Sequence, residues 1–470
     1  MIKKILVSLI AATVSQLVSS QHQIPIPTPA QLQWQEAELA ALISYDLHVF
    51  DGKEYVQQEN RITPVADYNI FNPQYFDTDQ WVKSLKDAGF RIAIFTVSHE
   101  TGFFFHQSDE TPYCMKALRW QHGKGDLLRD FKASCEKYGI LPGVYIGIRW
   151  NSFYGIHDFR VHGDNTFAEN RQKYYNTMVE KIVEEIFSRY GEWAMVWFDG
   201  GAHGPEQGGP DVLSVFEKYQ PGALFYHNLQ RADMRWGGSE SGTIPYPCWA
   251  TFPYPSIGAG ESARPEIAAN NFALLKTGDP DGPYYMPAMS DAPLRGYGGH
   301  DWVWGPDREE LIYPLDNLVE MYYHSVGHNT TLILGVTPGP DGLMPEADVK
   351  RLKEFGEEIN QRFSNPIAAT SGNGNKIQLK LSGRQRVNQV VLMEDIENGE
   401  RVRDFTVEGK GAGGWKTLCT GSCIGHKFIA RFEDAEVSSL RLKVNNSVGE
   451  PVIRSFSVFH IENHPIRDIR

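Results

Sequence analysis

Between residues 31 and 365, short apolar runs alternate with longer amphipathic stretches. The apolar runs predict strands at 41–45, 91–96, 141–148, 195–198, 223–227, 249–251, 284–287 and 331–334. The amphipathic stretches predict helices that end close to a glycine, as helix C-termini favour; they are 80–88, 126–138 and 168–189. Strands that alternate with helices predict a parallel sheet, and eight such units fit a (β/α)8 barrel of the TIM type. A doubly wound sheet fits the alternation too, but no Gly-x-Gly-x-x-Gly fingerprint follows the first strand, which favours the barrel.

After Asn365-Pro366 the pattern changes to strict alternation of apolar and polar residues. Residues 372–462 contain short runs of this kind, separated by Gly and Asn turns, such as Ile377-Gln-Leu-Lys-Leu381 and Leu440-Arg-Leu-Lys-Val444. This spacing predicts an antiparallel β-sandwich. We therefore expect a catalytic barrel over residues 21–365 and a C-terminal β-sandwich over 366–470. No flexible linker separates them, so the sandwich is expected to brace the barrel, and whether it also binds a ligand stays open.

The first twenty residues have the organisation of a signal peptide. Lys3 and Lys4 precede an apolar centre, and Val18-Ser-Ser20 provides small residues for cleavage. The apolar centre is short and contains Ser and Thr, so residues 1–20 predict a removed signal peptide rather than a membrane anchor. We expect a secreted or periplasmic protein with no membrane insertion.

Charge and cysteine content narrow the possible partners. The formal net charge is −13, from 45 basic and 58 acidic residues spread along the chain, so a nucleic-acid partner is not expected. Tryptophan and tyrosine beside Gly, Pro and Asp in loop-like stretches suit a carbohydrate. The five cysteines form no zinc-binding pattern, and no metal is expected. Cys419 and Cys423 are close enough in sequence to pair, but nothing in the sequence decides whether they do.

The stretch 194–201 holds the strongest candidate for chemistry. Four apolar residues, Met195 to Phe198, predict a buried strand, and Asp199 follows them directly before Gly200-Gly201. A carboxylate at the end of a buried strand costs free energy unless it is paired or used. Asp199 either caps the following turn or acts at the carboxyl end of a barrel strand, where catalytic groups lie.

Retaining glycoside hydrolysis needs a second carboxyl group about 5 Å from the first. Acidic candidates at the expected strand ends are Asp46, Glu54, Glu100, Asp199, Glu240 and Asp291. The loop Arg235-Trp-Gly-Gly-Ser-Glu-Ser-Gly242 is glycine-rich and can approach a pocket. We expect Trp236 to form an apolar wall that raises the pKa of Glu240, so that Glu240 can hold a proton. The alternative is a glutamate in a surface loop.

These segments resemble glycoside hydrolase family 29, the α-L-fucosidases, especially the branch that acts on α-1,3/1,4-linked fucose. The resemblance covers residues 27 to 462 and is carried by Pro27-Thr-Pro, Asp79-Gln-Trp-Val, Trp197-Phe-Asp-Gly200, Arg235-Trp-Gly-Gly-Ser-Glu240, Ser325-Val-Gly-His-Asn329 and Ser422-Cys-Ile-Gly-His426. It implies metal-independent hydrolysis with retention and no cofactor, with Asp199 as the nucleophile and Glu240 as the acid/base.

The chain departs from the family pattern where the family reads sugar hydroxyls. One histidine of two, His99, remains in the second-strand motif; Tyr55 replaces a tryptophan after Glu54; and Met289 replaces a glutamate between Pro287 and Asp291. We expect the substrate-binding set to be Asp46, His48, Glu54, His99, Glu100, Tyr154, Trp197, Trp236, Asp291, Arg295 and Trp302.

The sequence therefore predicts an exported, retaining exo-α-L-glycosidase that acts on a glycan with a terminal α-L-fucosyl residue. Because Asp46 and Glu100 would add acceptors for an extra hydroxyl, an α-L-galactosidase is the first alternative. A non-catalytic, glycan-binding relative is the second alternative. Retention of both Asp199 and Glu240 argues against it, because binding alone does not need two catalytic carboxyl groups.

Overall fold

The computed structural model describes residues 24–228, 230–256 and 272–462. Eight strands form one parallel sheet in the order β7-β6-β3-β2-β1-β12-β11-β8. Their bounds are β1 Leu39–Ile43, β2 Ile92–Ser98, β3 Leu141–Ile146, β6 Met195–Ala202, β7 Leu224–Asn228, β8 Arg235–Trp236, β11 Ala288–Pro293 and β12 Thr331–Val336. The end strands β7 and β8 approach each other, because the Asp233 backbone N–H donates to the carbonyl oxygen of Phe225 at 3.0 Å. The predicted (β/α)8 barrel is confirmed.

Two of the predicted barrel strands are wrong. The runs at 249–251 and 284–287 contribute to β9 (Thr251–Phe252) and β10 (Tyr284–Tyr285), which pair antiparallel with each other outside the barrel. The sixth barrel strand is β8, which has only two residues and was expected to belong to a loop. The seventh is β11, whose Ser290 and Asp291 interrupt the apolar run that a buried strand usually has.

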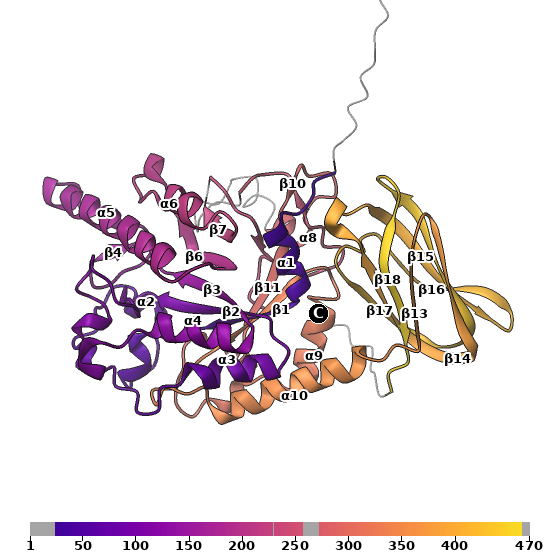
Figure 1. Ribbon diagram of the computed structural model, residues 1–470, viewed down its shortest axis with the longest axis horizontal. Helices are drawn as coiled ribbons and strands as arrows, with labels where there is room; N and C mark the ends of the chain where they lie inside the picture. Colours follow the sequence, from indigo (N-terminus) through magenta and orange to yellow (C-terminus); the bar gives the residue numbers. More distant parts are fainter. Residues whose placement is uncertain (1–23, 229, 257–271, 463–470) are drawn as a thin grey trace, which may run out of the picture.

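Most of the helices cover the outside of the barrel (Figure 1), whereas the first one packs Trp34 into the core inside the barrel. Their bounds are α1 Pro29–Ala37, α2 Gln57–Asn60, α3 Thr78–Asp87, α4 Leu127–Tyr138, α5 Thr166–Arg189, α6 Val212–Tyr219, α8 Ala273–Thr277, α9 Leu315–Tyr323 and α10 Glu346–Phe363. The α4 helix shows how the sequence sets the ends. The Asp126 side chain accepts a hydrogen bond from the Arg129 backbone N–H, and Gly139 takes the left-handed conformation at φ 63°. No helix in the described ranges is long and apolar enough to cross a bilayer.

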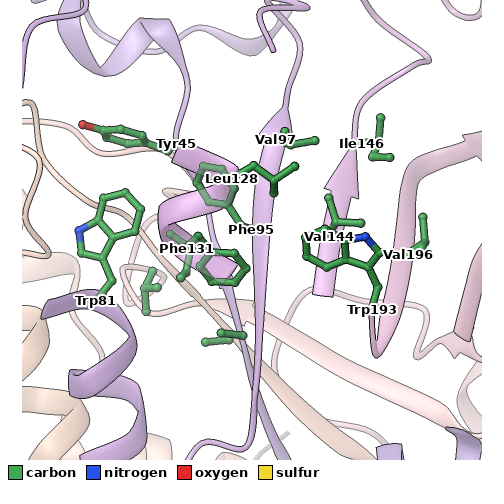
Figure 2. Close-up of a cluster of buried hydrophobic side chains, with 14 of the residues drawn as sticks. Tyr45, Trp81, Phe95, Val97, Leu128, Phe131, Val144, Ile146, Trp193 and Val196 are labelled. Carbon is green, nitrogen blue, oxygen red and sulfur yellow. The ribbon is translucent and has the colours of Figure 1, made fainter. Parts of the chain in front are cut away.

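The two faces of each barrel strand belong to different cores. Figure 2 shows the outward faces of β2 and β3, where Phe95 packs against Phe131 of α4 and Val144 lies beside Trp193. The alternate residues, including Ile94, Tyr145 and Trp197, fill the inside of the barrel. A period of two therefore decides which side chains can reach the space inside the barrel at its carboxyl end.

The C-terminal part is the predicted antiparallel β-sandwich. Its six strands have the order β13-β18-β14-β17-β15-β16 and enclose a core of their own. The bounds are β13 Ala368–Asn373, β14 Lys376–Glu394, β15 Val402–Gly411, β16 Gly414–Gly421, β17 Phe428–Ser447 and β18 Val452–Phe459. Shifts of register between Lys380 and Gln385 of β14 bend this long strand, as β-bulges do.

Buried polar contacts join the sandwich to the barrel. Both guanidinium ends of Arg431 bind the carboxylate of Glu320, at 2.6 and 2.8 Å. Asn329, which follows α9, donates to Glu400 at 2.5 Å and accepts from the backbone N–H of His426 at 2.7 Å. Such contacts fix the relative orientation of the two parts, consistent with a bracing role. All five cysteines are free thiols, so Cys419 and Cys423 form no disulfide.

Candidate active site

Asp199 enters the barrel because of its position on β6. Met195 and Trp197 face the inside of the barrel, whereas Val196 and Phe198 face the helices, so the same alternation turns Asp199 inward. Gly200 follows at φ 64°. A Cβ atom there would lie 2.7 Å from the side chain of Arg149, so glycine is needed both for the turn and for the close approach of Arg149.

Two aromatic side chains set the surroundings of Asp199. The hydroxyl of Tyr145 on β3 lowers the pKa of its carboxyl group, and the ring of His99 stacks on Tyr145 with centroids 5.7 Å apart. Burial raises the pKa of Asp199, while His99 and Tyr145 act in the opposite direction; the negative charges of Glu240 and Glu100 raise it further. The charge of Glu240 therefore acts directly on Asp199, and the two carboxyl groups share one site.

Glu240 lies in the loop after β8 and points its carboxylate at a neighbouring loop. Its Oε2 atom accepts hydrogen bonds from the indole Nε1 of Trp302, at 2.9 Å, and from the imidazole of His300. Burial opposes the charged form, but these two hydrogen bonds lower the pKa of Glu240 below its ordinary value. The expectation that Trp236 raises this pKa is therefore wrong. The indole of Trp236 donates instead to Asp291, at 2.9 Å.

Asp291 is a third carboxyl group at the same place. It is almost fully buried on β11 (3% exposed), and its pKa is raised well above the ordinary value by burial and by the charges of Glu240 and Asp199, against the hydrogen bond from Trp236. Burial and the neighbouring carboxylates thus favour the protonated form of Asp291. It can therefore support the indole of Trp236 without adding a full negative charge beside Asp199.

Asp46 and Glu100 are buried next to the site and are hydrogen-bonded to other protein groups. Asp46 is buried, and it accepts hydrogen bonds from the Thr101 hydroxyl at 2.5 Å and from the Leu47 backbone N–H at 2.8 Å. Its Oδ2 lies 3.6 Å from His99 Nδ1. Glu100 is buried too, and it accepts from the Tyr55 hydroxyl at 2.5 Å and from Arg61 Nε at 2.7 Å. Both carboxylates are thus occupied by protein donors, and their reading of a sugar hydroxyl stays a prediction.

The neighbouring carboxylates favour the protonated, positively charged form of His99. Burial lowers its pKa, but Asp46, Glu100 and Asp199 together raise it above the ordinary value. Its side chain keeps 16% of its surface exposed beside Asp199. His48 lies near the same group of residues, because its ring is 5.7 Å from that of Tyr55, which is hydrogen-bonded to Glu100.

Trp302 and Trp197 form apolar parts of the site. Trp302 packs against Gly335 of β12, where a Cβ atom would lie 2.4 Å from the indole ring. Trp197 is buried inside the barrel between the rings of Tyr145 and Tyr226, with centroids 5.7 and 5.5 Å away. Trp197 therefore lies one layer below the carboxyl groups and supports them.

Three predicted site residues lie away from this cluster. The guanidinium of Arg295 is buried and paired with Asp348 of α10. Tyr154 contacts the Thr111 hydroxyl at 2.9 Å and the aromatic side chains around α5. Glu54 is 73% exposed and bonds Arg308. None of the three is hydrogen-bonded to Asp199 or Glu240 in the part of the chain that is described.

Sequence reasoning missed the roles of His300, Tyr145 and Tyr226. Tyr145 and Tyr226 are the inward residues of β3 and β7, and a correct strand register would have identified them. His300 lies in a long loop after β11, and nothing in its spacing links it to residue 240. Across residues 24–228, 230–256 and 272–462, no group of three His, Cys, Asp or Glu side chains is placed to hold a metal ion.

Comparison with known proteins identifies the family. The family model described as Alpha-L-fucosidase matches residues 27–237. A crystal structure of a candidate α-L-fucosidase from Bacteroides thetaiotaomicron superimposes with a TM-score of 0.91, at 53% identity, over 93% of this chain and all of that one. The chain belongs to the α-L-fucosidase family, glycoside hydrolase family 29.

Other members of glycoside hydrolase family 29 are more distant but cover most of the chain. The Arabidopsis thaliana protein Alpha-L-fucosidase 1 is 28% identical over 93% of this chain and 88% of its own length. A glycoside hydrolase 29 family member from an unknown rumen bacterium is 26% identical, with a TM-score of 0.78 over 94% of this chain and 78% of that one. The chain is thus a glycoside hydrolase whose barrel and sandwich are both shared with relatives.

Proposed function

We propose that the protein is an exported, retaining exo-α-L-fucosidase that removes terminal α-L-fucosyl residues from glycans. The observation that carries this proposal is the position of two carboxyl groups, Asp199 on β6 and Glu240 in the loop after β8, close enough for the charge of Glu240 to raise the pKa of Asp199. Membership of the α-L-fucosidase family and the names of its relatives support fucose as the sugar.

The geometry supports a division of labour between the two carboxyl groups. Asp199 is fixed on a strand, with Tyr145 and His99 stabilising its negative charge, which suits a nucleophile that attacks the anomeric carbon. Glu240 is on a loop and half-exposed, at 41%, which suits a group that must meet both the leaving aglycone and the incoming water.

The reaction then has two steps. In the first, an oxygen of Asp199 bonds to the anomeric carbon, the glycosidic C–O bond breaks, and Glu240 gives its proton to the leaving oxygen. In the second, Glu240 takes a proton from water, whose oxygen attacks the anomeric carbon and releases Asp199. Two inversions at the anomeric carbon give overall retention.

A direct test uses an aryl α-L-fucoside and proton NMR of the first sugar released. Retention predicts that α-L-fucose appears first and then mutarotates. A parallel incubation with the aryl α-L-galactoside measures the preference at C6, and faster cleavage of the galactoside would reassign the substrate. Binding of fucose without turnover of either glycoside would contradict the enzyme proposal and favour a glycan-binding protein.

Export is proposed from the sequence of residues 1–20, which lie outside the described residues. A charged start, an apolar centre and a small-residue cleavage site together support it. N-terminal sequencing of the protein recovered from its native cells tests it. A mature chain that begins near Gln21 is expected, and an uncleaved chain in the cytoplasm would contradict export.

A further inference from the structure

Two N–H donors converge on a single oxygen of the Glu240 carboxylate. His300 Nε2 and Trp302 Nε1 both contact Oε2, the second at 2.9 Å. Over the described ranges, no residue is hydrogen-bonded to the other oxygen, Oε1. When His300 is protonated, a proton on the carboxyl group therefore belongs on Oε1, because a hydroxyl at Oε2 would face two N–H groups. The two oxygens of Glu240 thus have different roles: Oε2 is held by hydrogen bonds, and Oε1 is available to exchange a proton.

This arrangement is not needed to stabilise the fold. The side chains of His300 and Glu240 are 55% and 41% exposed, and ion pairs with that exposure contribute little to stability. Trp302, in contrast, is fixed against Gly335, where no space for a Cβ atom remains. One donor of the pair is therefore rigid, and the other, His300, is exposed and can change its charge.

We propose that His300 is the positioning residue of the acid/base: it holds Glu240 through Oε2 so that Oε1 carries the proton that is transferred. The proposal rests on the function proposed above for Glu240. In the first step the Oε1–H bond breaks, the proton passes to the glycosidic oxygen, and that oxygen leaves with the electron pair of the broken C–O bond. The charge left on Glu240 is stabilised at Oε2 by His300 and Trp302.

The charged groups around the pair come from several elements. Glu240 faces His300 from the loop after β11, Asp291 from β11 and Asp199 from β6; the hydroxyl of Tyr226 on β7 is near them. His300 faces Glu240 and also Asp301, which in turn is 3.4 Å from Arg308. The nearest charges to the imidazole are therefore negative, and they favour its protonated form.

The sign of the coupling follows from these contacts. The hydrogen bond to Glu240 raises the pKa of His300, against burial, which lowers it. In return, His300 lowers the pKa of Glu240, against burial, which raises it. Loss of His300 should therefore raise the pKa of Glu240 and make it a weaker acid towards a poor leaving group.

Kinetic measurements on His300→Leu and His300→Gln test the proposal. The readout is kcat/KM against pH for two aryl α-L-fucosides, one with a good and one with a poor leaving group. For His300→Leu we expect the alkaline limb to move to higher pH, because the pKa of Glu240 rises when His300 is lost. On the plateau of the profile, where Glu240 is protonated in both proteins, we expect the rate with the poor leaving group to fall ~10-fold, with a smaller loss for the good one.

Two comparisons separate positioning from simple damage. His300→Gln keeps an N–H donor without the charge, so it should recover part of the rate with the poor leaving group and still show the shifted limb. His460→Gln removes a histidine that lies 3.5 Å from Asp434 in the sandwich, and it should match the wild-type protein. A wild-type pH profile and leaving-group dependence in His300→Leu would overturn the proposal.

A second readout does not depend on catalysis. The ring C–H signals of His300 in NMR, identified by their absence in His300→Leu, give the pKa of His300 in the wild-type protein and in Glu240→Gln. We expect a lower pKa in Glu240→Gln, and an unchanged value would overturn the pairing. If the wild-type protein cleaves no fucoside, the proposed function fails, but this titration still decides whether the two side chains are coupled.

Discussion

The hydroxyl of Tyr145 stabilises the charged carboxylate of Asp199 from the neighbouring barrel strand. The register of β3 and β6 places Tyr145 opposite Trp197, two residues before Asp199, so both side chains point into the barrel. Burial raises the pKa of Asp199, and the Tyr145 hydroxyl counteracts this effect by stabilising the charged form. The hydroxyl of Tyr145 therefore helps to keep the proposed nucleophile ionised.

Tyr145→Phe should lower activity and move its acidic limb. Without the hydroxyl the pKa of Asp199 rises further, so the acidic limb of kcat/KM should shift to higher pH. A hydrogen bond to a charged group contributes about 1.5 to 3 kcal/mol, which corresponds to a loss of roughly 10- to 100-fold in kcat/KM at neutral pH. Steady-state kinetics over pH measure both effects.

Tyr190→Phe is the matched control for this variant. Its hydroxyl is also bonded to a carboxylate, that of Asp126 at 2.8 Å, but between α4 and α5. It should change stability and leave the pH profile in place. If both variants shift the acidic limb equally, the hydroxyl of Tyr145 does not act on Asp199.

Gly335→Ala should disturb the acid/base through Trp302. The added methyl group would lie 2.4 Å from the indole ring, so Trp302 must move and its hydrogen bond to Glu240 must change. Misplacement of a catalytic group by about 1 Å can cost ~100-fold in rate, so we expect a loss of ~10- to 100-fold with a poor leaving group. Leaving-group dependence of kcat/KM in the variant measures it.

Gly372→Ala provides the comparison for Gly335→Ala. At this position in β13 the nearest atom to an added Cβ is 3.6 Å away, an ordinary contact. The variant should fold and react as the wild-type protein does. If the two variants cleave a substrate with a poor leaving group at equal rates, Trp302 does not contribute to acid catalysis.

The buried carboxyl group of Glu394 predicts a pH-dependent stability of the sandwich. Burial first, and the charge of Glu400 in addition, raise the pKa of Glu394 to about 8, although the backbone N–H groups of Arg401 and Val402 act against this. The folded state thus holds a proton that the unfolded chain loses at a pKa of roughly 4.3. This stability is fully present below the unfolded pKa and is lost as the pH rises towards 8.

Glu394→Gln removes that titration. Below about pH 4 the variant and the wild-type protein should unfold alike, because Glu394 is then mostly protonated in both the folded and the unfolded state. At pH 8.5 the variant should be more stable by roughly 2 to 5 kcal/mol, from the size of the shift. Urea denaturation at the two values of pH measures this, and an equal difference at both would exclude titration of Glu394 as the cause.

Much of the fold could be predicted from the sequence because its signals are local. The Gly139 ending of α4 and the apolar run of β6 need only neighbouring residues to be recognised. The strand β8 has two residues and carries no period, and β11 contains Ser290 and Asp291, so neither gave a local signal. These two strands form because they pair with other strands when the barrel closes. That pairing joins residues far apart in the sequence.

The site residues also differ in whether local sequence could predict them. Asp199 could be predicted because a carboxylate at the end of a buried strand stands out in the sequence. The partners of Glu240 could not, since His300 and Trp302 are 60 and 62 positions away and reach it only through the folded loops. The pKa of Glu240 was therefore predicted in the wrong direction, because Trp236 was taken as its neighbour.

The most direct test of the central claim is to trap the covalent intermediate. An activated 2-deoxy-2-fluoro-α-L-fucoside should be attacked normally and then released slowly, so that the sugar stays bonded to the nucleophile. Digestion and tandem mass spectrometry locate the bond. We predict that the fluorosugar is attached to Asp199 in the wild-type protein and that Asp199→Ala remains unlabelled. A label on Glu240 or Asp291, or turnover of fucosides by Asp199→Ala at the wild-type rate, would contradict the account.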